Sequence, residues 1–89
     1  MPVRTLTLTA GVARTVDLAS DAQTVAVYNL GVTSDIITVG LGNVAPAPDA
    51  DDTYAVPPGS RRQMNWGRIT GRQVRLYSPG PSKAEVEWS

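Results

Sequence analysis

Cysteine and histidine are both absent from the 89-residue sequence. A chain without cysteine forms no disulfide, no thiolate zinc site and no cysteine nucleophile. A chain without histidine lacks the commonest general base and the commonest metal ligand. Ser60 has no histidine to activate it, and Glu85 and Glu87 fit the exposed face of a strand better than an acid–base site. The sequence therefore predicts a protein that is not an enzyme and holds no cofactor.

Long apolar runs are absent as well. No segment approaches the roughly 20 residues that a helix needs to span a bilayer. Met1 is followed by neither a basic segment nor an apolar one, so we expect no signal peptide. We therefore expect a soluble protein that is made in a cytoplasm and has no membrane partner.

The chain is also short, and we interpret residues 1–89 as one domain. A domain of this size buries only about 60% of the surface that its unfolded chain exposes. Small domains usually add a disulfide, a metal or a partner subunit to a limited core. Since no disulfide can form, self-association is the remaining way to bury more apolar surface, and we expect a homo-oligomer.

Charges of both signs are present but unevenly distributed, although the formal net charge is zero. Residues 1–60 carry two arginines and six aspartates, a net charge of −4, and residues 61–89 carry six basic side chains and two glutamates, a net charge of +4. From Arg61 to Arg75 there are five arginines and no acidic residue. Arginine suits fixed contacts at interfaces, so this tract predicts a surface that binds protein.

Alternation of apolar and polar residues, which is typical of half-buried strands, runs through most of the chain. In Val12–Leu18 the residues Val12, Val16 and Leu18 share the apolar side with Arg14, which indicates a strand near an edge or an interface. Gln23–Leu30 is apolar on both faces and is the best candidate for a central strand. The expected strands are Val3–Thr9, Val12–Leu18, Gln23–Leu30, Asp35–Leu41, a run through Tyr54 and Val56, Arg61–Trp66, Gln73–Ser78 and Lys83–Trp88.

Turn residues separate these runs. Pro57-Pro58-Gly59-Ser60 hinges the two runs of Thr53–Trp66, and Asn43–Asp52, with two prolines and three aspartates, is interpreted as an exposed loop. Seven or eight short strands at intervals of about ten residues predict an all-β fold, either a single small β-sandwich or a jelly-roll-like barrel of antiparallel strands. The pairing order stays open, because jelly-roll and immunoglobulin-like topologies share this pattern.

Three features offer alternatives to plain protein binding. Asp49–Asp52 could place carboxylates around calcium, but the segment lacks the full ligand spacing and turn glycine of a calcium loop, so we favour a solvated loop and predict no metal. The arginine tract could grip nucleic acid, although an isoelectric point of 6.1 is low for that role. Trp66 and Trp88 fall on apolar strand faces, which leaves Tyr54 and Tyr77 as the aromatic residues we expect to be exposed for sugar stacking.

Several segments resemble small virion proteins of tailed phages, namely the all-β head decoration or cement proteins and related minor structural subunits. The segments are Val25–Asn29 (VAVYN), Ile37–Gly42 (ITVGLG), Val56–Arg62 (VPPGSRR), Val74–Ser78 (VRLYS) and Ala84–Glu87 (AEVE). The resemblance spans most of the chain. It implies a β-sandwich that binds the outside of a capsid shell, often as a trimer at junctions of the major capsid protein, and stabilises the head against internal DNA pressure.

On this interpretation the protein is a virion structural component made in a bacterial host. Its acidic loop and arginine tract would meet between neighbouring subunits, because a heterologous contact joins two different surfaces. The candidate interface residues are Arg61, Arg62, Arg68, Arg72, Arg75, Asp49, Asp51 and Asp52. The alternatives are a tail or head–tail connector component and a small carbohydrate-binding adhesion module.

Overall fold

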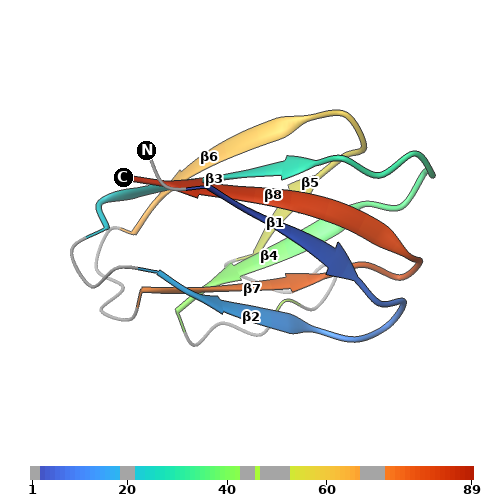
Figure 1. Cartoon of the computed structure of the whole chain (residues 1–89), viewed down its shortest axis with the longest axis horizontal. Helices are drawn as coiled ribbons and strands as arrows, with labels where there is room; N and C mark the ends of the chain where they lie inside the picture. The colour runs from blue at the N-terminus through green and yellow to red at the C-terminus, as the bar shows by residue number, and fades with distance from the viewer. Residues whose placement is uncertain (1–2, 19–21, 43–45, 47–52, 67–71) are drawn as a thin grey trace.

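The computed structural model describes residues 3–18, 22–42, 46, 53–66 and 72–89. Within these residues it contains eight strands, arranged as two facing sheets (Figure 1). The strands are β1 (Val3–Leu8), β2 (Arg14–Asp17), β3 (Thr24–Asn29), β4 (Ile37–Leu41), β5 (Thr53–Val56), β6 (Arg61–Asn65), β7 (Gln73–Tyr77) and β8 (Ser82–Trp88). In this part of the chain there is no helix long and apolar enough to cross a bilayer. The predicted small all-β sandwich is confirmed.

The pairing order is that of a jelly roll. One sheet has the order β1-β8-β3-β6, the other has the order β2-β7-β4-β5, and each neighbouring pair is antiparallel. The pairs β1–β8, β2–β7, β3–β6 and β4–β5 form one long two-stranded ribbon that is folded over on itself, which is the jelly-roll arrangement. β5 and β6 belong to different sheets, so the turn at Pro57–Ser60 carries the chain from one sheet to the other instead of closing a hairpin.

The core lies between the sheets and consists of the inward residues that the alternation predicts. β4 is buried along its whole length, because it is central in its sheet and carries Gly40 and Thr38 on its outer face. β3 is central in the other sheet, as predicted, and β2 is an edge strand, as the position of Arg14 indicated. The buried core side chains are Leu6, Leu8, Val16, Val25, Val27, Ile37, Val39, Leu41, Val56, Met64, Trp66, Val74, Leu76, Ala84 and Val86.

The side-chain predictions were wrong at several positions. Val12 lies in the turn before β2 and is 54% exposed, because its N–H donates to Thr9 O and the strand begins only at Arg14. Tyr28, on the outer face of its sheet, is exposed, whereas Tyr54 and Tyr77 are both half-buried. Trp88 is only partly buried at the margin of the core.

The predicted loop Asn43–Asp52 lies mostly outside the described residues. Pro46 is its one described residue, and it is buried. The prediction of an exposed loop is therefore wrong at Pro46 and stays a prediction for the other residues.

A single buried asparagine ties together the segments that meet at one end of the sandwich. Asn29 is 0% exposed, and its Nδ2 donates to Val56 O at 2.9 Å and to Asp35 O at 3.1 Å. Its Oδ1 accepts from the N–H of Gly31 at 2.9 Å and from Ser82 Oγ at 3.3 Å. A buried amide must satisfy its donors and its acceptor, and here all of them are used.

Candidate functional site

The candidate arginines do not form one surface. Arg61 lies on β6 and faces outward from the β1-β8-β3-β6 sheet, whereas Arg75 lies on β7 and faces outward from the other sheet. The two residues are close in sequence, but the chain crosses from one sheet to the other between β6 and β7. Arg68, Asp49, Asp51 and Asp52 lie outside the described residues, so the proposed meeting of the acidic loop with the arginine tract stays a prediction.

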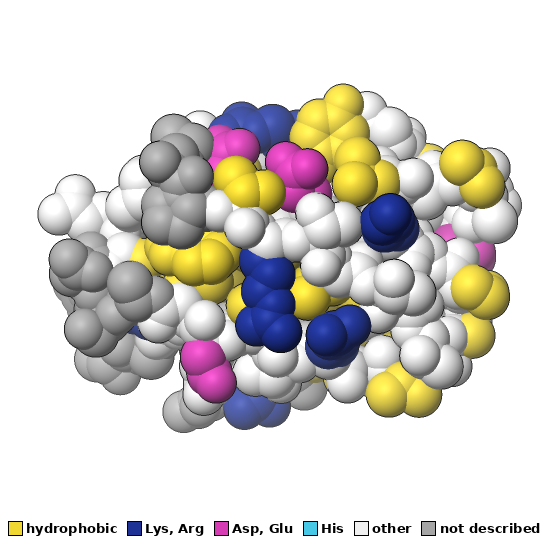
Figure 2. All heavy atoms as spheres, in the orientation of Figure 1, with side chains coloured by type: hydrophobic (Ala, Val, Ile, Leu, Met, Phe, Trp, Pro, Cys, Tyr) yellow, Lys and Arg dark blue, Asp and Glu magenta, His cyan; other side chains and the backbone are white. Residues whose placement is uncertain are grey.

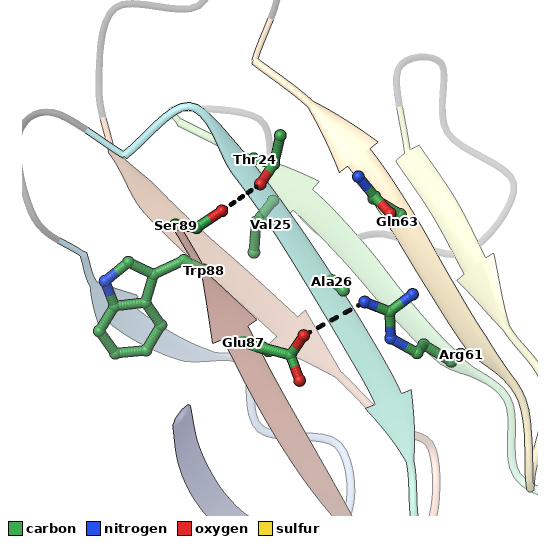
Figure 3. A pocket seen from close by; sticks show the side chains of 8 residues that line it. All are labelled: Thr24, Val25, Ala26, Arg61, Gln63, Glu87, Trp88 and Ser89. Carbon is green, nitrogen blue, oxygen red and sulfur yellow. Dashed lines mark hydrogen bonds and ion pairs between the residues drawn. The ribbon is translucent and has the colours of Figure 1, made fainter. Parts of the chain in front are cut away.

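Arg61 lines a shallow hollow on the outer face of its sheet (Figure 3). Its Nη2 lies 3.3 Å from Glu87 Oε1, and Thr24 Oγ1 and Ser89 Oγ are hydrogen-bonded at 2.8 Å beside it. The hollow forms because Ala26 stands between the longer side chains Gln63 and Glu87 on the neighbouring strands.

The hollow has a volume of about 130 Å³. Sites for small molecules usually measure about 300–1,000 Å³, so it has room for water or a small polar group and not for a sugar. The Trp88 ring points away from Gln63 and Arg61 and offers no stacking platform here (Figure 3).

Arg62 closes the open side of the sandwich between β5 and β6. Its guanidinium carbon lies 4.8 Å from the centre of the Tyr54 ring, and its Nη1 donates to Ala55 O at 3.3 Å. A cation over an aromatic face is attracted by the ring quadrupole. Arg62 is thus engaged within the fold, although its side chain is exposed.

Arg72 and Arg75 are both half-buried. Arg72 Nε donates to Ala22 O at 2.6 Å, and its guanidinium carbon lies 4.9 Å from the Trp66 ring. Arg75 stands opposite Gly40 in the ladder, and its Nε is buried without a hydrogen-bond partner in the described part of the structure. Arg72 therefore serves to cover the tryptophan, and Arg61 is the candidate arginine that combines exposure with a place on an open sheet face.

Four turns gather at the end of the sandwich opposite the two chain termini (Figure 1). They are residues 9–13, 30–36, 57–60 and 78–81, and we call this surface the turn end. Gly11 N donates to Ser78 O at 2.9 Å and Gly59 N donates to Asn29 O at 2.9 Å, which joins the turns in pairs. A Cβ on Gly80 would overlap the Asp35 carboxylate, so the second and fourth turns also touch.

The turn end is apolar and nearly uncharged. Val32 is 99% exposed, and Val12, Leu30 and Ile36 are also exposed. Asp35 is the one charged residue of these four turns, and its Oδ2 accepts a hydrogen bond from Thr33 Oγ1 at 2.6 Å. Figure 2 shows apolar side chains along this end, at the right of the view. A cluster of exposed apolar side chains on a small domain is typical of a surface that binds another molecule.

Sequence reasoning missed the turn end. Val32 stands among the turn residues Gly31, Thr33 and Ser34, where an apolar side chain has no strand face to pack on. The doublet Ile36-Ile37 likewise breaks the alternation, so that one of the two must face outward. Both signals were available, but nothing in them showed that the four turns meet.

The described residues include no group of three or more acidic side chains placed to hold a metal ion. The Asp49–Asp52 segment, which was considered for calcium, lies outside them.

The residues that the structure describes form eight strands in jelly-roll order, and a comparison with solved structures finds a similar fold. No family model matches the chain, and no curated protein matches it in sequence. Among solved structures, a de novo designed double-stranded β-helix determined by solution NMR is similar, with a TM-score of 0.68 over 100% of both chains at 13% sequence identity. At that identity the likeness concerns the fold alone.

Proposed function

We propose that this chain is a non-enzymatic virion structural protein, a capsid decoration or cement subunit that stabilises a phage head by binding where capsid proteins meet. The observation that carries the proposal is the turn end, with Val32 fully exposed beside Ile36 and Leu30. Burial of apolar surface supplies most of the free energy of protein association. The strand and turn segments resemble tailed-phage virion proteins, and this resemblance is the reason for proposing a capsid protein as the partner.

The geometry favours the turn end over the arginine tract as the contact with the capsid. Arg62 and Arg72 are engaged within the fold, and Arg61 and Arg75 face opposite ways. A decoration protein presents one surface to the shell and repeats it at every symmetric position, and such repetition gives avidity beyond one contact. The turn end places several exposed apolar side chains at one end of the molecule.

The test is co-sedimentation of the purified chain with DNA-filled heads of the phage that encodes it, at low and high salt. We expect saturable binding that survives high salt, because apolar contacts are not screened. Val32→Asp should weaken binding without loss of folding stability, since Val32 is almost fully exposed. Asn65→Asp, at an exposed position at the other end of β6 from the turn end, is the matched control.

Each alternative has its own outcome in this assay. Binding to isolated tails but not to heads would indicate a component of the tail or of the head–tail connector. If binding disappears at high salt and Val32→Asp binds as well as the wild type does, the arginines and not the turn end make the contact with the capsid. The carbohydrate-binding alternative gains no support from the hollow beside Arg61, which is too small for a sugar ring.

A further inference from the structure

The first strand of the chain forms an edge that no other described strand covers. β1 is the longest of the four edge strands, with six residues, against four in β2, four in β5 and five in β6. It pairs with β8 on one side only. A long edge strand presents unpaired N–H and C=O groups and is a template for pairing with another strand.

The register shows which backbone groups face outward. Leu30, which directly follows β3, donates its N–H to Lys83 O, so the backbone N–H and C=O of Lys83 point to the β3 side and away from β1. Thr7 stands opposite Lys83, and opposite residues of an antiparallel pair either face each other or both face away. The backbone N–H and C=O of Thr7 therefore point to the free edge, and by alternation so do those of Thr5 and Val3. The Arg14 Nη1 donation to Thr7 O at 2.9 Å agrees with this direction.

We propose that the β1 edge binds the β1 edge of a second copy of this chain, in an antiparallel two-fold pair that joins two four-stranded sheets into one. The occupant follows from self-complementarity. In an antiparallel pair, the side chains of directly opposite residues lie on the same face of the sheet. Because side chains alternate between the two faces, a two-fold pair of identical strands must place one residue opposite its own copy, and the axis passes between these two copies.

The two positions nearest the middle of β1, Thr5 and Leu6, leave the most residues paired. An axis at Thr5 places Thr5 opposite its own copy and Val3 opposite Thr7. An axis at Leu6 places Thr5 opposite Thr7 and Leu6 opposite its own copy.

Both arrangements set threonines against threonine or valine on the outer face, and such pairs are favourable in sheets. Arg4, the one charge of β1, would face Leu6 or Leu8 and never its own copy. Val3, half exposed in the single chain, would gain a neighbour on the added strand.

The other edges are less suited to a second copy. β6 exposes the consecutive charges Arg61 and Arg62, and β2 begins with an arginine and ends with an aspartate. β1 and β5 each have one carbonyl that accepts from an arginine, Thr7 O from Arg14 and Ala55 O from Arg62, but β5 has four residues against six in β1. Short and charged edges are the usual means by which a sheet avoids strand addition.

The decisive measurement is the mass of the chain in solution by light scattering across a concentration series. We expect twice the monomer mass at high concentration. Thr5→Pro removes an outward N–H from the centre of β1, at an edge position where proline is tolerated. Because two equivalent hydrogen bonds disappear, dimerisation should weaken roughly thirtyfold.

Gln63→Pro is the matched control, because Gln63 is the middle residue of β6 and its N–H also faces a free edge. It should dimerise as the wild type does. Circular dichroism and cooperative melting check that both variants fold, and Thr5→Lys, which leaves the backbone unchanged, replaces Thr5→Pro if that variant does not fold. A monomer at all concentrations, a closed trimer, or a Thr5 variant that dimerises normally would each overturn the proposal.

Single-cysteine variants locate the axis, since the chain has no cysteine of its own. Opposite residues in a sheet lie within disulfide reach. Thr5→Cys should cross-link to itself if the axis passes through Thr5, whereas an axis at Leu6 requires a mixture with Thr7→Cys. Gln63→Cys should not cross-link, and absence of a cross-link in both β1 experiments would contradict the paired edge. These measurements use the chain alone, so they are independent of the virion function proposed above.

Discussion

An arginine bridges each of the two open sides of the sandwich. Between β1 and β2, Arg14 Nη1 donates to Thr7 O at 2.9 Å, and between β5 and β6, Arg62 Nη1 donates to Ala55 O at 3.3 Å. In both cases the arginine comes from an edge strand of one sheet and its acceptor from an edge strand of the other. Only Arg62 also lies over an aromatic ring, that of Tyr54.

The difference shows how two edges of one fold can take different roles. A side chain that occupies an edge carbonyl blocks strand addition at that point. The β5/β6 side combines short strands with charged side chains, the ring of Tyr54 and the hydrogen bonds of Asn29 to the end of β5. The β1/β2 side has one arginine for a six-residue edge. We therefore expect the first side to contribute stability and the second to allow association.

Removal of the Asn29 amide should destabilise the fold more than any other change at the β5/β6 side. Asn29→Ala leaves the carbonyls of Val56 and Asp35 without their donors, and buried groups that lose a partner each cost about 1–3 kcal/mol. We expect a loss of about 3 kcal/mol in the free energy of unfolding, measured by urea denaturation. Asn65→Ala, at an exposed position of β6, should cost less than about 0.5 kcal/mol.

Asn29→Asp also removes the donors, but it places a buried carboxylate opposite the carbonyls of Val56 and Asp35. Because an unpaired buried charge is costly, we expect a larger loss than for Asn29→Ala at neutral pH. If Asn29→Ala costs no more than Asn65→Ala, the asparagine does not hold this side together.

Arg62→Ala should have the next largest effect. It removes the hydrogen bond to Ala55 and the contact with the Tyr54 ring, which together are worth about 1 kcal/mol at an exposed site. Arg62→Lys keeps the charge over the ring and should recover part of the loss. Equal stability of Arg62→Ala and wild type, measured by thermal and urea denaturation, would show that the cation over Tyr54 contributes nothing.

Arg14→Ala sharpens the comparison from the other side. Its exposed hydrogen bond has no aromatic partner, so we expect a loss of about 0.5 kcal/mol, measured at a concentration low enough to keep the chain monomeric. Light scattering at high concentration should show association at least as strong as in the wild type, since the Thr7 carbonyl becomes free. A loss as large as that of Arg62→Ala would remove the distinction between the two sides.

The inward side chains could be predicted because burial of one sheet face imposes a period of two. Ile37 with Val39 and Val74 with Leu76 are the apolar members of their alternating strands, and all four are buried. The pairing order could not be predicted, because alternation specifies which face is buried but not which strand lies alongside.

The candidate site was harder to predict for the same reason. Arg61 and Arg75 are 14 positions apart in sequence, yet the topology sends β6 and β7 to different sheets. The sequence does not mark Asn29 as a structural residue, because its acceptors come from residues 6 and 27 positions further along the chain. Both outcomes depend on tertiary pairing, which no local pattern contains.

The ion pair between β6 and β8 should contribute least to the free energy of unfolding. Arg61 Nη2 and Glu87 Oε1 lie 3.3 Å apart, and the side chains are 44% and 25% exposed. Exposed pairs are worth about 0–1 kcal/mol, because water and salt screen them. A double-mutant cycle of Arg61→Ala and Glu87→Ala should give a coupling of about 0.3 kcal/mol that vanishes in high salt. A coupling above that of Arg62 with Tyr54, measured in the same way, would mean that the sheet face and not the open side stabilises this region of the fold.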